Sequence, residues 1–423
     1  MDLAETRRMP LIGKAKEARN LVVGLDIGTS KVVVVVAEIR PEGGYEVLAV
    51  CSQPSRGLKK GMVVNIESTV EAIQQAVSEA ELMADCRIRE VTAGIAGSHI
   101  RSFNSQGMVV VRDREVSQVD VDSVIRTAKA VSIPTDQQIL HVLNQEFIID
   151  GQEDVREPLG MSGVRLEVKV HIVTGAVSAA QNILRCVRRC GLEVRDLVLQ
   201  PLASAAAVLS DDERDLGVVL LDIGGGTADL AVFRHGAIRH TAVIPIAGDQ
   251  ITSDIAMALR TPTKDAEEIK RRYGCALRQL ADPSEMIEVP GVGERPPRQL
   301  SRQTLAEVIE PRAEEIYTLV LEELRRSGND EGLSSGIVIT GGSASMPGMV
   351  ELGEEVFHLP VRMGVPDYAG PLSELLRGPR CATGAGLLRM AYEEQMRREQ
   401  ARLAGGSVQQ LVARMRAWFE ANF

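Results

Sequence analysis

Two short segments combine an aspartate at the end of an apolar stretch with glycine and hydroxyl residues that lead into a second apolar stretch. The first is VVGLDIGTSKVVVVVAEI at 22–39, and the second is LLDIGGGTADLAVF at 220–233. Glycine lets backbone N–H groups approach an anion closely, and a serine or threonine hydroxyl adds a donor. Each segment therefore predicts a phosphate cradle, with Asp26 and Asp222 holding a metal ion through water. The alternative is a simple glycine hairpin in which the aspartate is only a turn residue.

The two segments repeat one plan at the scale of a whole domain. Asp26 and Asp222 begin Asp-Ile-Gly units that lie 196 residues apart (222 − 26), which is too long for a solenoid period and indicates an internal duplication. We therefore expect two similar lobes that grip one polyphosphate. The chain has no GxxxxGK[ST] sequence, and each glycine run leads into a strand and not a helix. Neither a Walker loop nor a Rossmann turn is predicted.

Composition and charge narrow the function classes. The 423 residues carry a net charge of −10 with a pI of about 5.3, which disfavours a nucleic-acid partner. The six cysteines show no CxxC spacing, which favours the reduced cytosol, and Cys186 and Cys190 are expected to be packed thiols on one helix. No signal-peptide core and no run of 18 apolar residues occur, which predicts a protein that is neither secreted nor membrane-spanning.

Hydrophobic periodicity predicts alternating strands and helices. In the first half we expect strands at 21–27, 31–39, 45–51, 91–97, 168–176 and 194–200, and helices at 66–84 and 179–190. In the second half we expect a helix after 201, the glycine hairpin, a strand near 238–245, and helices at 253–259, 265–274, 304–326 and 384–395. Asn65 is a suitable N-cap, and Pro311 should kink the longest helix.

These elements predict an α/β protein of two lobes, each interrupted by an inserted subdomain. The expected units are a flexible N-terminal lead at 1–20, the core of lobe I at 21–84 and 166–200, its inserted subdomain at 85–165, the core of lobe II at 201–246 and 330–392, its inserted subdomain at 247–329, a charged linker at 393–406, and a C-terminal amphipathic helix at 407–423.

The last segment, SVQQLVARMRAWFEANF, has one apolar face. That face comprises Val408, Leu411, Val412, Met415, Trp418, Phe419 and, at the end, Phe423. The segment also holds the single tryptophan of the chain. A 17-residue helix is roughly 25 Å long, and with two arginines and a glutamate inside we expect it to lie on a bilayer and not to cross it. The alternative is a helix that docks back on the protein or pairs with a partner helix.

Three motifs carry a resemblance to a known superfamily. LDIGTSK, LDIGGGT and ITGGSASMPG form, in this order, a signature similar to that of the actin, sugar kinase and Hsp70-type ATPases. PSRGLKKGMV at 54–63 and RQTLAEVIEPR at 302–312 further resemble the bacterial cell-division family FtsA, from about residue 20 to the C-terminus. The resemblance implies an actin-like ATPase fold, ribonuclease H-like and duplicated, with ATP and Mg²⁺ as ligands.

The resemblance also implies roles for individual residues. The implied nucleotide-binding residues are Gly28, Thr29, Ser30 and Lys31 in the first phosphate loop, Gly224, Gly225, Gly226 and Thr227 in the second, and Gly341, Gly342, Ser343 and Met346 beside the adenosine. Glu267 and Lys270 match a nucleoside-contacting helix, where their i, i+3 spacing would let the carboxylate take ribose hydroxyls while the lysine stem covers the base. The alternative is an ordinary exposed helix pair.

Gln200 occupies the position at which chaperone and bacterial-actin relatives carry a glutamate before a proline. A glutamine can orient water but is a poor base. The residue is therefore a candidate catalytic group for at most slow ATP hydrolysis. A polar side chain that is merely satisfied at a strand end is an equally good explanation.

The implied function is that of a membrane anchor in cell division. Such a protein would bind the FtsZ C-terminal tail, associate with itself, with inner-membrane lipids and with other division proteins, and lie peripherally on the cytoplasmic face of the inner membrane. The tail would dock on the second inserted subdomain, with Arg302 pairing with its acidic end. The alternative for Arg302 is that it helps to cap its own helix.

Three other functions remain open from the sequence. A sugar or metabolite kinase would need a catalytic carboxylate and would have no use for the C-terminal helix. A chaperone ATPase would need a substrate-binding domain, and only 17 residues follow the expected linker. A scaffold of pilus machinery fits RQTLAEVIEPR and the terminal helix less well.

Overall fold

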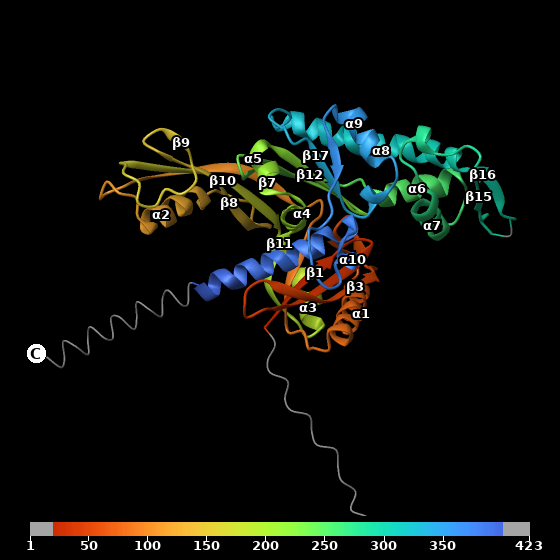
Figure 1. The fold of residues 1–423 in the computed structure, drawn as a ribbon, viewed down its shortest axis with the longest axis horizontal. Helices are drawn as coiled ribbons and strands as arrows, with labels where there is room; N and C mark the ends of the chain where they lie inside the picture. Colours follow the sequence, from red (N-terminus) through yellow and green to blue (C-terminus); the bar gives the residue numbers. More distant parts are fainter. Residues whose placement is uncertain (1–19, 294, 401–423) are drawn as a thin grey trace, which may run out of the picture.

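The computed structural model describes residues 20–293 and 295–400 (Figure 1). In the view of Figure 1, lobe I lies below with β1, β3, α1 and α3, and the core of lobe II lies above with β12, β17, α8 and α9. The two inserted subdomains extend to opposite sides of lobe II, with α2 at one end and α7 at the other. The predicted C-terminal amphipathic helix, 407–423, lies outside the described residues.

Lobe I is built on a five-stranded sheet in the order β11-β6-β1-β2-β3. Its strands are β1 (Leu21–Ile27), β2 (Lys31–Ile39), β3 (Tyr45–Pro54), β6 (Glu90–Ile95) and β11 (Glu193–Leu199). β2 is antiparallel to both of its neighbours, β1 and β3, whereas β6 is parallel to both β1 and β11. Because helices cover both faces, the central strands read as near-continuous apolar runs, and 32–37 is fully buried.

Lobe II repeats this sheet in the order β14-β13-β12-β17-β18. Its strands are β12 (Val218–Ile223), β13 (Ala228–Arg234), β14 (Ala237–Ile244), β17 (Ile337–Thr340) and β18 (Val361–Met363). Again the first three strands are antiparallel and the last two are parallel to β12 and to each other. The predicted duplication is confirmed strand by strand.

The helices repeat as well. α1 (Ile66–Ala84) and α8 (Arg302–Arg326) precede β6 and β17, and α3 (Val177–Arg189) and α9 (Met349–Phe357) precede β11 and β18. α1 has the predicted bounds because Asn65 Oδ1 accepts a hydrogen bond from Ser68 N at 3.0 Å and its apolar face is buried. Pro311 lies inside α8 without ending it.

The inserted subdomain of lobe I has its own sheet, in the order β7-β10-β8-β9. It consists of β7 (Arg101–Val110), α2 (Gln118–Lys129), β8 (Gln137–Ile149), β9 (Gln152–Val155) and β10 (Arg165–Ala176). The expected bounds, 85–165, need correction at both ends. β6 pairs with β1 and so belongs to lobe I, and β10 pairs with β7 and β8 and so belongs to the insert.

This subdomain emerges from lobe I but packs on lobe II. Ser102 Oγ donates to the Thr241 carbonyl at 2.8 Å, and His171 Nε2 lies 2.9 Å from Thr241 Oγ1. His171 is buried, and burial lowers its pKa to about 4, so its ring is neutral near pH 7. The ring therefore adds neutral hydrogen bonds to the contact between the insert and β14, which also contains an ion pair between Arg239 and Glu146 at 3.8 Å.

The inserted subdomain of lobe II combines helices with a small two-stranded sheet. Its elements are α6 (Gly248–Ala258), α7 (Thr263–Tyr273), the 3₁₀ turn η1 (Arg278–Leu280), β15 (Met286–Val289) and β16 (Arg298–Ser301). The remaining short elements are β4 (Leu58–Lys59), β5 (Met62–Val63), α5 (Asp211–Leu216), η2 (Ser343–Ser345), α10 (Ser373–Leu376) and η3 (Pro379–Cys381).

Each lobe ends in a helix that crosses to the other. α4 (Gln200–Val208) follows β11, and residues 382–400 form the helix that follows β18. Residues 393–400, expected to begin a charged linker, instead continue this helix. Ion pairs one turn apart, Arg389 with Glu393 at 3.0 Å and Arg398 with Glu394 at 2.7 Å, support it.

Candidate functional site

The two glycine motifs form turns of the same shape. In hairpin 1, between β1 and β2, Gly28 N donates to the Lys31 carbonyl at 2.9 Å. In hairpin 2, between β12 and β13, Gly224 N donates to the Thr227 carbonyl at 2.9 Å. The strand–turn–strand prediction is confirmed for both motifs.

The two hairpins face each other across the junction of the lobes. A Cβ on Gly225 would lie 1.9 Å from Ser30 Oγ, and a Cβ on Gly226 would lie 2.6 Å from Thr29 Oγ1. Both distances are far below any real contact of a Cβ atom. Gly225 and Gly226 therefore let hairpin 2 accommodate the hydroxyls of hairpin 1.

A buried aspartate lies beside each hairpin. Asp26 is 5% exposed and Asp222 is 8% exposed. Burial raises the pKa of Asp26 to about 7, against the opposing effect of the Lys31 ammonium, and burial also raises the pKa of Asp222. The Lys31 amino group donates to the Arg380 carbonyl, and burial lowers its pKa.

α4 contacts both aspartates from one of its faces. Gln200 Nε2 donates to Asp26 Oδ1 at 2.9 Å, and Ser204 Oγ donates to Asp222 Oδ2 at 2.5 Å. The spacing of i, i+4 puts these two side chains one above the other on the helix. The structure therefore brings Gln200 to the metal-binding candidates, with its amide nitrogen engaged on Asp26. A role for Gln200 in hydrolysis stays a prediction.

Three further polar residues belong to this site and were missed from the sequence. Ser204 and Thr383 both donate to Asp222 Oδ2, the latter at 3.2 Å. Asp229 lies opposite Asp222 in the β12–β13 pairing, and burial together with Asp222 raises its pKa to about 7. Its Oδ1 has no hydrogen-bond partner within 20–293 and 295–400. Asp229 could have been found from the sequence, because it pairs with Asp222 when the two strands are folded back on each other at the glycines. Ser204 and Thr383 have no signal in the neighbouring sequence.

The acids fit one divalent cation held through water. Among the residues that the structure describes, no group of three or more His, Cys, Asp or Glu side chains is arranged to ligate a metal ion directly. Asp26 and Asp222 are nevertheless buried carboxylates whose charged forms are disfavoured by burial. Mg²⁺ keeps several of its waters when bound and needs only one or two carboxylates, so this pair suits it.

The predicted nucleoside-contacting pair lies against hairpin 2. Lys270 Nζ is 2.6 Å from Glu267 Oε2 and donates to the Gly248 carbonyl at 2.9 Å and to Thr252 Oγ1 at 2.7 Å. Lys270 is only 8% exposed, so the pair is not an ordinary exposed one. Gly248 N in turn donates to the Gly224 carbonyl at 3.2 Å, which brings the N-terminus of α6 to hairpin 2.

The third motif, ITGGSASMPG, lies beside hairpin 2 and Asp222 in the same site. Ser343 Oγ donates to the Gly224 carbonyl at 2.7 Å, and a Cβ on Gly341 would lie 2.3 Å from Asp222 Oδ1. Gly342 has open space where a Cβ would be, and Met346 Sδ lies 3.3 Å from the corresponding point on Gly274 at the end of α7. The phosphate, metal and adenosine candidates thus converge, and their binding of nucleotide stays a prediction.

Arg302 begins α8 and is paired within the chain. Its Nε donates to the Tyr273 carbonyl at 2.9 Å, and its Nη1 lies 2.9 Å from Glu285 Oε2. The N-cap of α8 is Ser301, whose Oγ accepts from Thr304 N at 3.2 Å. Capping of its own helix is therefore not what Arg302 does.

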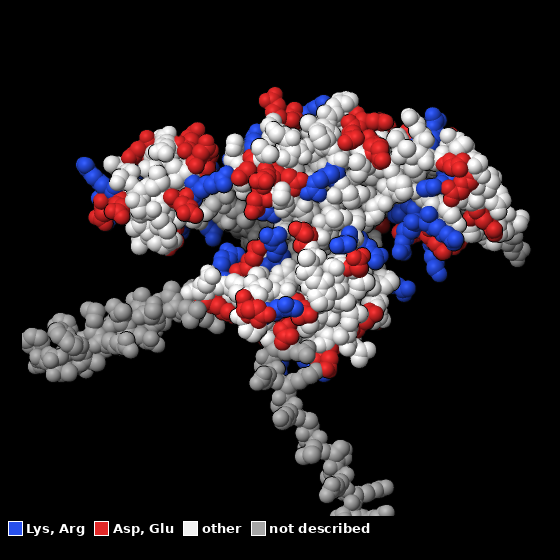
Figure 2. Space-filling view, viewed as in Figure 1, with Lys and Arg blue, Asp and Glu red and all other residues white. Residues whose placement is uncertain are grey.

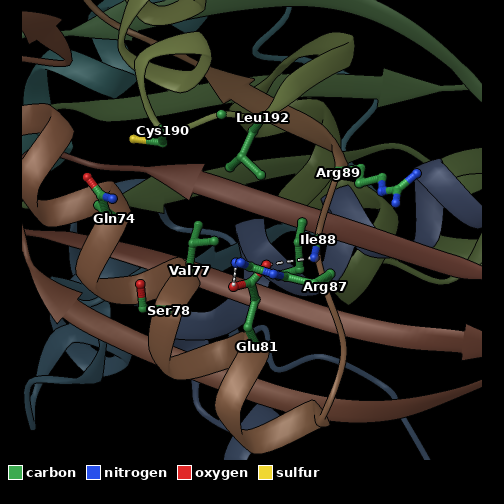
Figure 3. A pocket seen from close by; sticks show the side chains of 10 residues that line it. Gln74, Val77, Ser78, Glu81, Arg87, Ile88, Arg89, Cys190 and Leu192 are labelled. Carbon is green, nitrogen blue, oxygen red and sulfur yellow. Dashed lines mark hydrogen bonds and ion pairs between the residues drawn. The ribbon is translucent and has the colours of Figure 1, made fainter. Parts of the chain in front are cut away.

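A hollow lies away from this site, on lobe I (Figure 3). It has a volume of about 340 Å³ and is lined from α1, from the loop that precedes β6 and from the turn after α3. Glu81 Oε2 and Oε1 accept from Arg87 Nη1 at 3.0 Å and Ile88 N at 2.8 Å. None of the predicted nucleotide-binding residues lines it.

The membrane-face residues predicted at 408–423 lie outside the described part of the chain. Within the part that is described, every helix is too short or too polar to cross a bilayer.

Comparisons with solved structures show an actin-like ATPase fold. A chain of the PilM–PilN type IV pilus biogenesis complex aligns with a TM-score of 0.62 at 20% identity, over 88% of this chain and 98% of that one. MreB5 of Spiroplasma citri bound to ADP aligns with a TM-score of 0.54 at 14% identity, over 90% and 98%. At such identities the likeness establishes the fold alone.

Sequence comparisons identify the family. Family models for "Cell division protein FtsA" and "SHS2 domain inserted in FTSA" match residues 219–386 and 97–174, the second in agreement with the observed insert. FtsA of Pseudomonas aeruginosa is 57% identical over 96% of this chain and 99% of its own length, and FtsA of Escherichia coli K12 is 46% identical over 96% and 99%. The chain therefore belongs to the FtsA family of cell division proteins.

Proposed function

We propose that this protein binds Mg·ATP between its lobes, associates with itself, and anchors FtsZ to the cytoplasmic face of the inner membrane through residues 407–423. The observation that carries the nucleotide part is the approach of the two hairpins, where Gly225 and Gly226 leave room for Ser30 and Thr29. The relatives are named as cell division proteins, which supports the cellular role.

In the proposed complex, the backbone N–H groups of both hairpins bind the phosphates. Asp26 and Asp222 hold Mg²⁺ through water, and the metal neutralises charge on the phosphates. Lys31 adds a cation on the side of lobe I. With a glutamine at position 200 and no described carboxylate in its place, ATP hydrolysis is slow at most.

The membrane part rests on the apolar face at 408–423. One short helix with a small net positive charge binds a bilayer weakly and reversibly. A row of such helices on a polymer makes later contacts intramolecular, which raises the overall avidity by orders of magnitude. Self-association and membrane binding therefore support each other in this proposal.

The test is co-sedimentation of the full chain with inner-membrane-like vesicles in the presence of Mg·ATP, beside a chain that stops at Gly406. We expect only the full chain to pellet with lipid. A matched full-length control, Trp418→Glu, keeps the length and removes apolar character, so it should behave like the truncated chain. If both lengths pellet equally, or neither does, the anchor is wrong and a soluble kinase of the same superfamily becomes the better explanation.

The FtsZ tail is proposed to dock on the inserted subdomain of lobe II. Basic side chains gather there around α7 (Figure 2), where Lys264, Arg271 and Arg272 are exposed. An acidic tail would compete with Glu285 for Arg302, because that ion pair is partly exposed and such pairs contribute little.

A synthetic FtsZ tail peptide tests this docking. Arg302→Glu should weaken peptide binding by about tenfold or more, because a repulsive charge replaces an attractive one. Arg326→Glu at the far end of α8 is the matched control, since Arg326 is exposed and pairs only locally with Glu323. Equal binding by the two variants would remove Arg302 from the docking site.

A further inference from the structure

The helix at 382–400 begins in the candidate metal site. Thr383 Oγ1 donates to Asp222 Oδ2 at 3.2 Å, and it lies 3.0 Å from Ser204 Oγ, which donates to the same oxygen at 2.5 Å. All three side chains are less than 9% exposed. Thus Asp222 is held by one hydroxyl from each of the two helices that cross between the lobes.

The first turns of this helix fit tightly between the lobes. A Cβ on Gly24 of β1 would lie 2.7 Å from the Gly384 carbonyl, and a Cβ on Gly386 would lie 1.7 Å from the Ala203 carbonyl of α4. Leu387 is fully buried in a small cluster with Ala203. Helix, β1 and α4 therefore have no free space in which to slide past one another.

The far end of the described helix is fastened to the edge of lobe I. The rings of Tyr392 and Tyr45 lie 5.1 Å apart, and Tyr392 Oη accepts from Gly44 N at 3.0 Å. Gln395 accepts from Arg195 at 3.0 Å and donates to Asn20 at 2.5 Å. Six residues, 401–406, separate the described end of the helix from the amphipathic segment at 407–423.

We propose that Thr383 is a positioning residue for Asp222, and that through it the helix at 382–400 conveys the state of the metal site to the C-terminal segment of the same chain. Because the helix cannot slide against β1 and α4, it moves with them as one body, and a shift of Asp222 toward a bound Mg·ATP that displaces Thr383 is carried to the far end of the helix. This inference rests on the proposed binding of ATP and lipid. The proposed function links nucleotide and membrane only through the avidity of a polymer, and this inference adds a link within a single chain.

The first experiment measures ATP affinity with and without Mg²⁺ for Thr383→Val and Thr383→Ser. We expect the Mg²⁺-dependent gain in affinity to fall about tenfold in Thr383→Val, which corresponds to one hydrogen bond to a charged group. Thr383→Ser keeps the hydroxyl and should restore it. Thr127→Val on α2, an exposed threonine of the insert, is the control. An unchanged Mg²⁺ dependence in Thr383→Val would overturn the positioning role.

The second experiment uses Trp418, the single tryptophan of the chain, as a reporter of the C-terminal segment. Vesicles of phosphatidylethanolamine and phosphatidylglycerol are titrated into the full chain, below the concentration at which light scattering detects polymer. In the wild type, saturating Mg·ATP should change the vesicle concentration that gives half of the maximal Trp418 signal by about fivefold, in either direction. Tyr392→Ala, which lies outside the nucleotide site, should bind Mg·ATP as the wild type does and lose this shift.

The outcomes separate the two proposals. If the wild type binds no ATP, or if vesicles leave the fluorescence emission of Trp418 unchanged, the proposed function fails and this inference fails with it. If the wild type binds both ligands but Tyr392→Ala keeps the full ATP-dependent shift, only the connection through the helix is wrong.

Discussion

Hairpins 1 and 2 have the same backbone turn but carry different side chains. Each closes with a 2.9 Å bond from a glycine N–H to the carbonyl three residues later. Hairpin 1 then carries two hydroxyls and Lys31, whereas hairpin 2 carries Gly225 and Gly226 at the same two positions. A duplicated element has thus become complementary to its copy, because one copy supplies side chains and the other supplies the space for them.

The acids beside the hairpins differ in the same way. Asp26 is held by an amide, from Gln200, and lies near the Lys31 ammonium. Asp222 is held by two hydroxyls and faces a third buried acid, Asp229, where β2 of lobe I has Val33 opposite Asp26. Lobe II therefore concentrates negative charge and lobe I offsets it, which suits a cation and a polyphosphate bound between them.

The largest expected effect concerns this excess of acid in lobe II. The folded-state pKa of Asp229 is about 7, above its ordinary value of 3.8. The native state therefore binds a proton that the unfolded chain has lost, and stability falls as the pH rises from about 4 to about 7. A shift of this size corresponds to about 4 kcal/mol. Asp229→Asn should remove this share of the pH dependence of the free energy of unfolding, measured by denaturant titration without nucleotide, and leave the share of Asp26, whose pKa is also about 7.

Asp212→Asn on α5 is the control for that experiment, because Asp212 is exposed and its substitution should leave the pH dependence unchanged. Two equally flattened curves would mean that the net charge of the chain, and not the buried acid, sets the dependence. A curve for Asp229→Asn that keeps the full slope would assign the dependence to Asp26.

The next effect breaks the complementarity of the hairpins. Gly225→Ala puts a Cβ 1.9 Å from Ser30 Oγ, and overpacking of this kind costs about 1–3 kcal/mol. We expect ATP affinity to fall accordingly, by roughly 5- to 150-fold, in isothermal titration. Ser30→Ala removes the clashing oxygen together with a phosphate donor, so Gly225→Ala should weaken ATP binding less in the Ser30→Ala background than in the wild type. Equal losses in the two backgrounds would show that the hairpins do not meet in the binding state.

A smaller effect compares one position in the two copies. Lys31 and Thr227 are equivalent, as the residues whose carbonyls close the two turns. Lys31→Met removes a charge that lies near both Asp26 and Asp222 and should lower ATP affinity about tenfold, with a smaller salt dependence. Thr227→Val removes only a neutral donor, to Asp229, and should cost about threefold or less. Equal losses would mean that the ammonium of Lys31 is not directed at the phosphates.

The sequence was sufficient where the determining signal is local. Helix 66–84 follows from its cap and its apolar spacing, and both hairpins follow from an aspartate and glycines within six residues. The bounds of the first insert were wrong because β10 looks like any buried strand, and only its pairing with β7 and β8 assigns it to the insert.

The site was incomplete for the same reason. Ser204 and Thr383 are 179 residues apart and meet only because two helices cross between the lobes. Residues 393–406 are predicted to be a charged linker, whereas in the structure residues 393–400 continue the helix and their charges pair along it. Tertiary crossings such as these leave no periodicity in the sequence.

The smallest effect separates two hydroxyls that the sequence treats as equivalent phosphate donors. Thr29 Oγ1 accepts from Gly61 N at 3.0 Å and so fastens the β4–β5 turn to hairpin 1, whereas Ser30 is exposed. Thr29→Val should therefore lower the free energy of unfolding by about 1 kcal/mol, and Ser30→Ala should change it by less than about 0.5 kcal/mol. For ATP affinity we expect the reverse order, because the Ser30 hydroxyl is exposed whereas Thr29 Oγ1 already accepts from Gly61 N. If Thr29→Val weakened ATP binding more than it weakened the fold, hairpin 1 would use both hydroxyls on the ligand, with Thr29 donating to a phosphate while it accepts from Gly61 N.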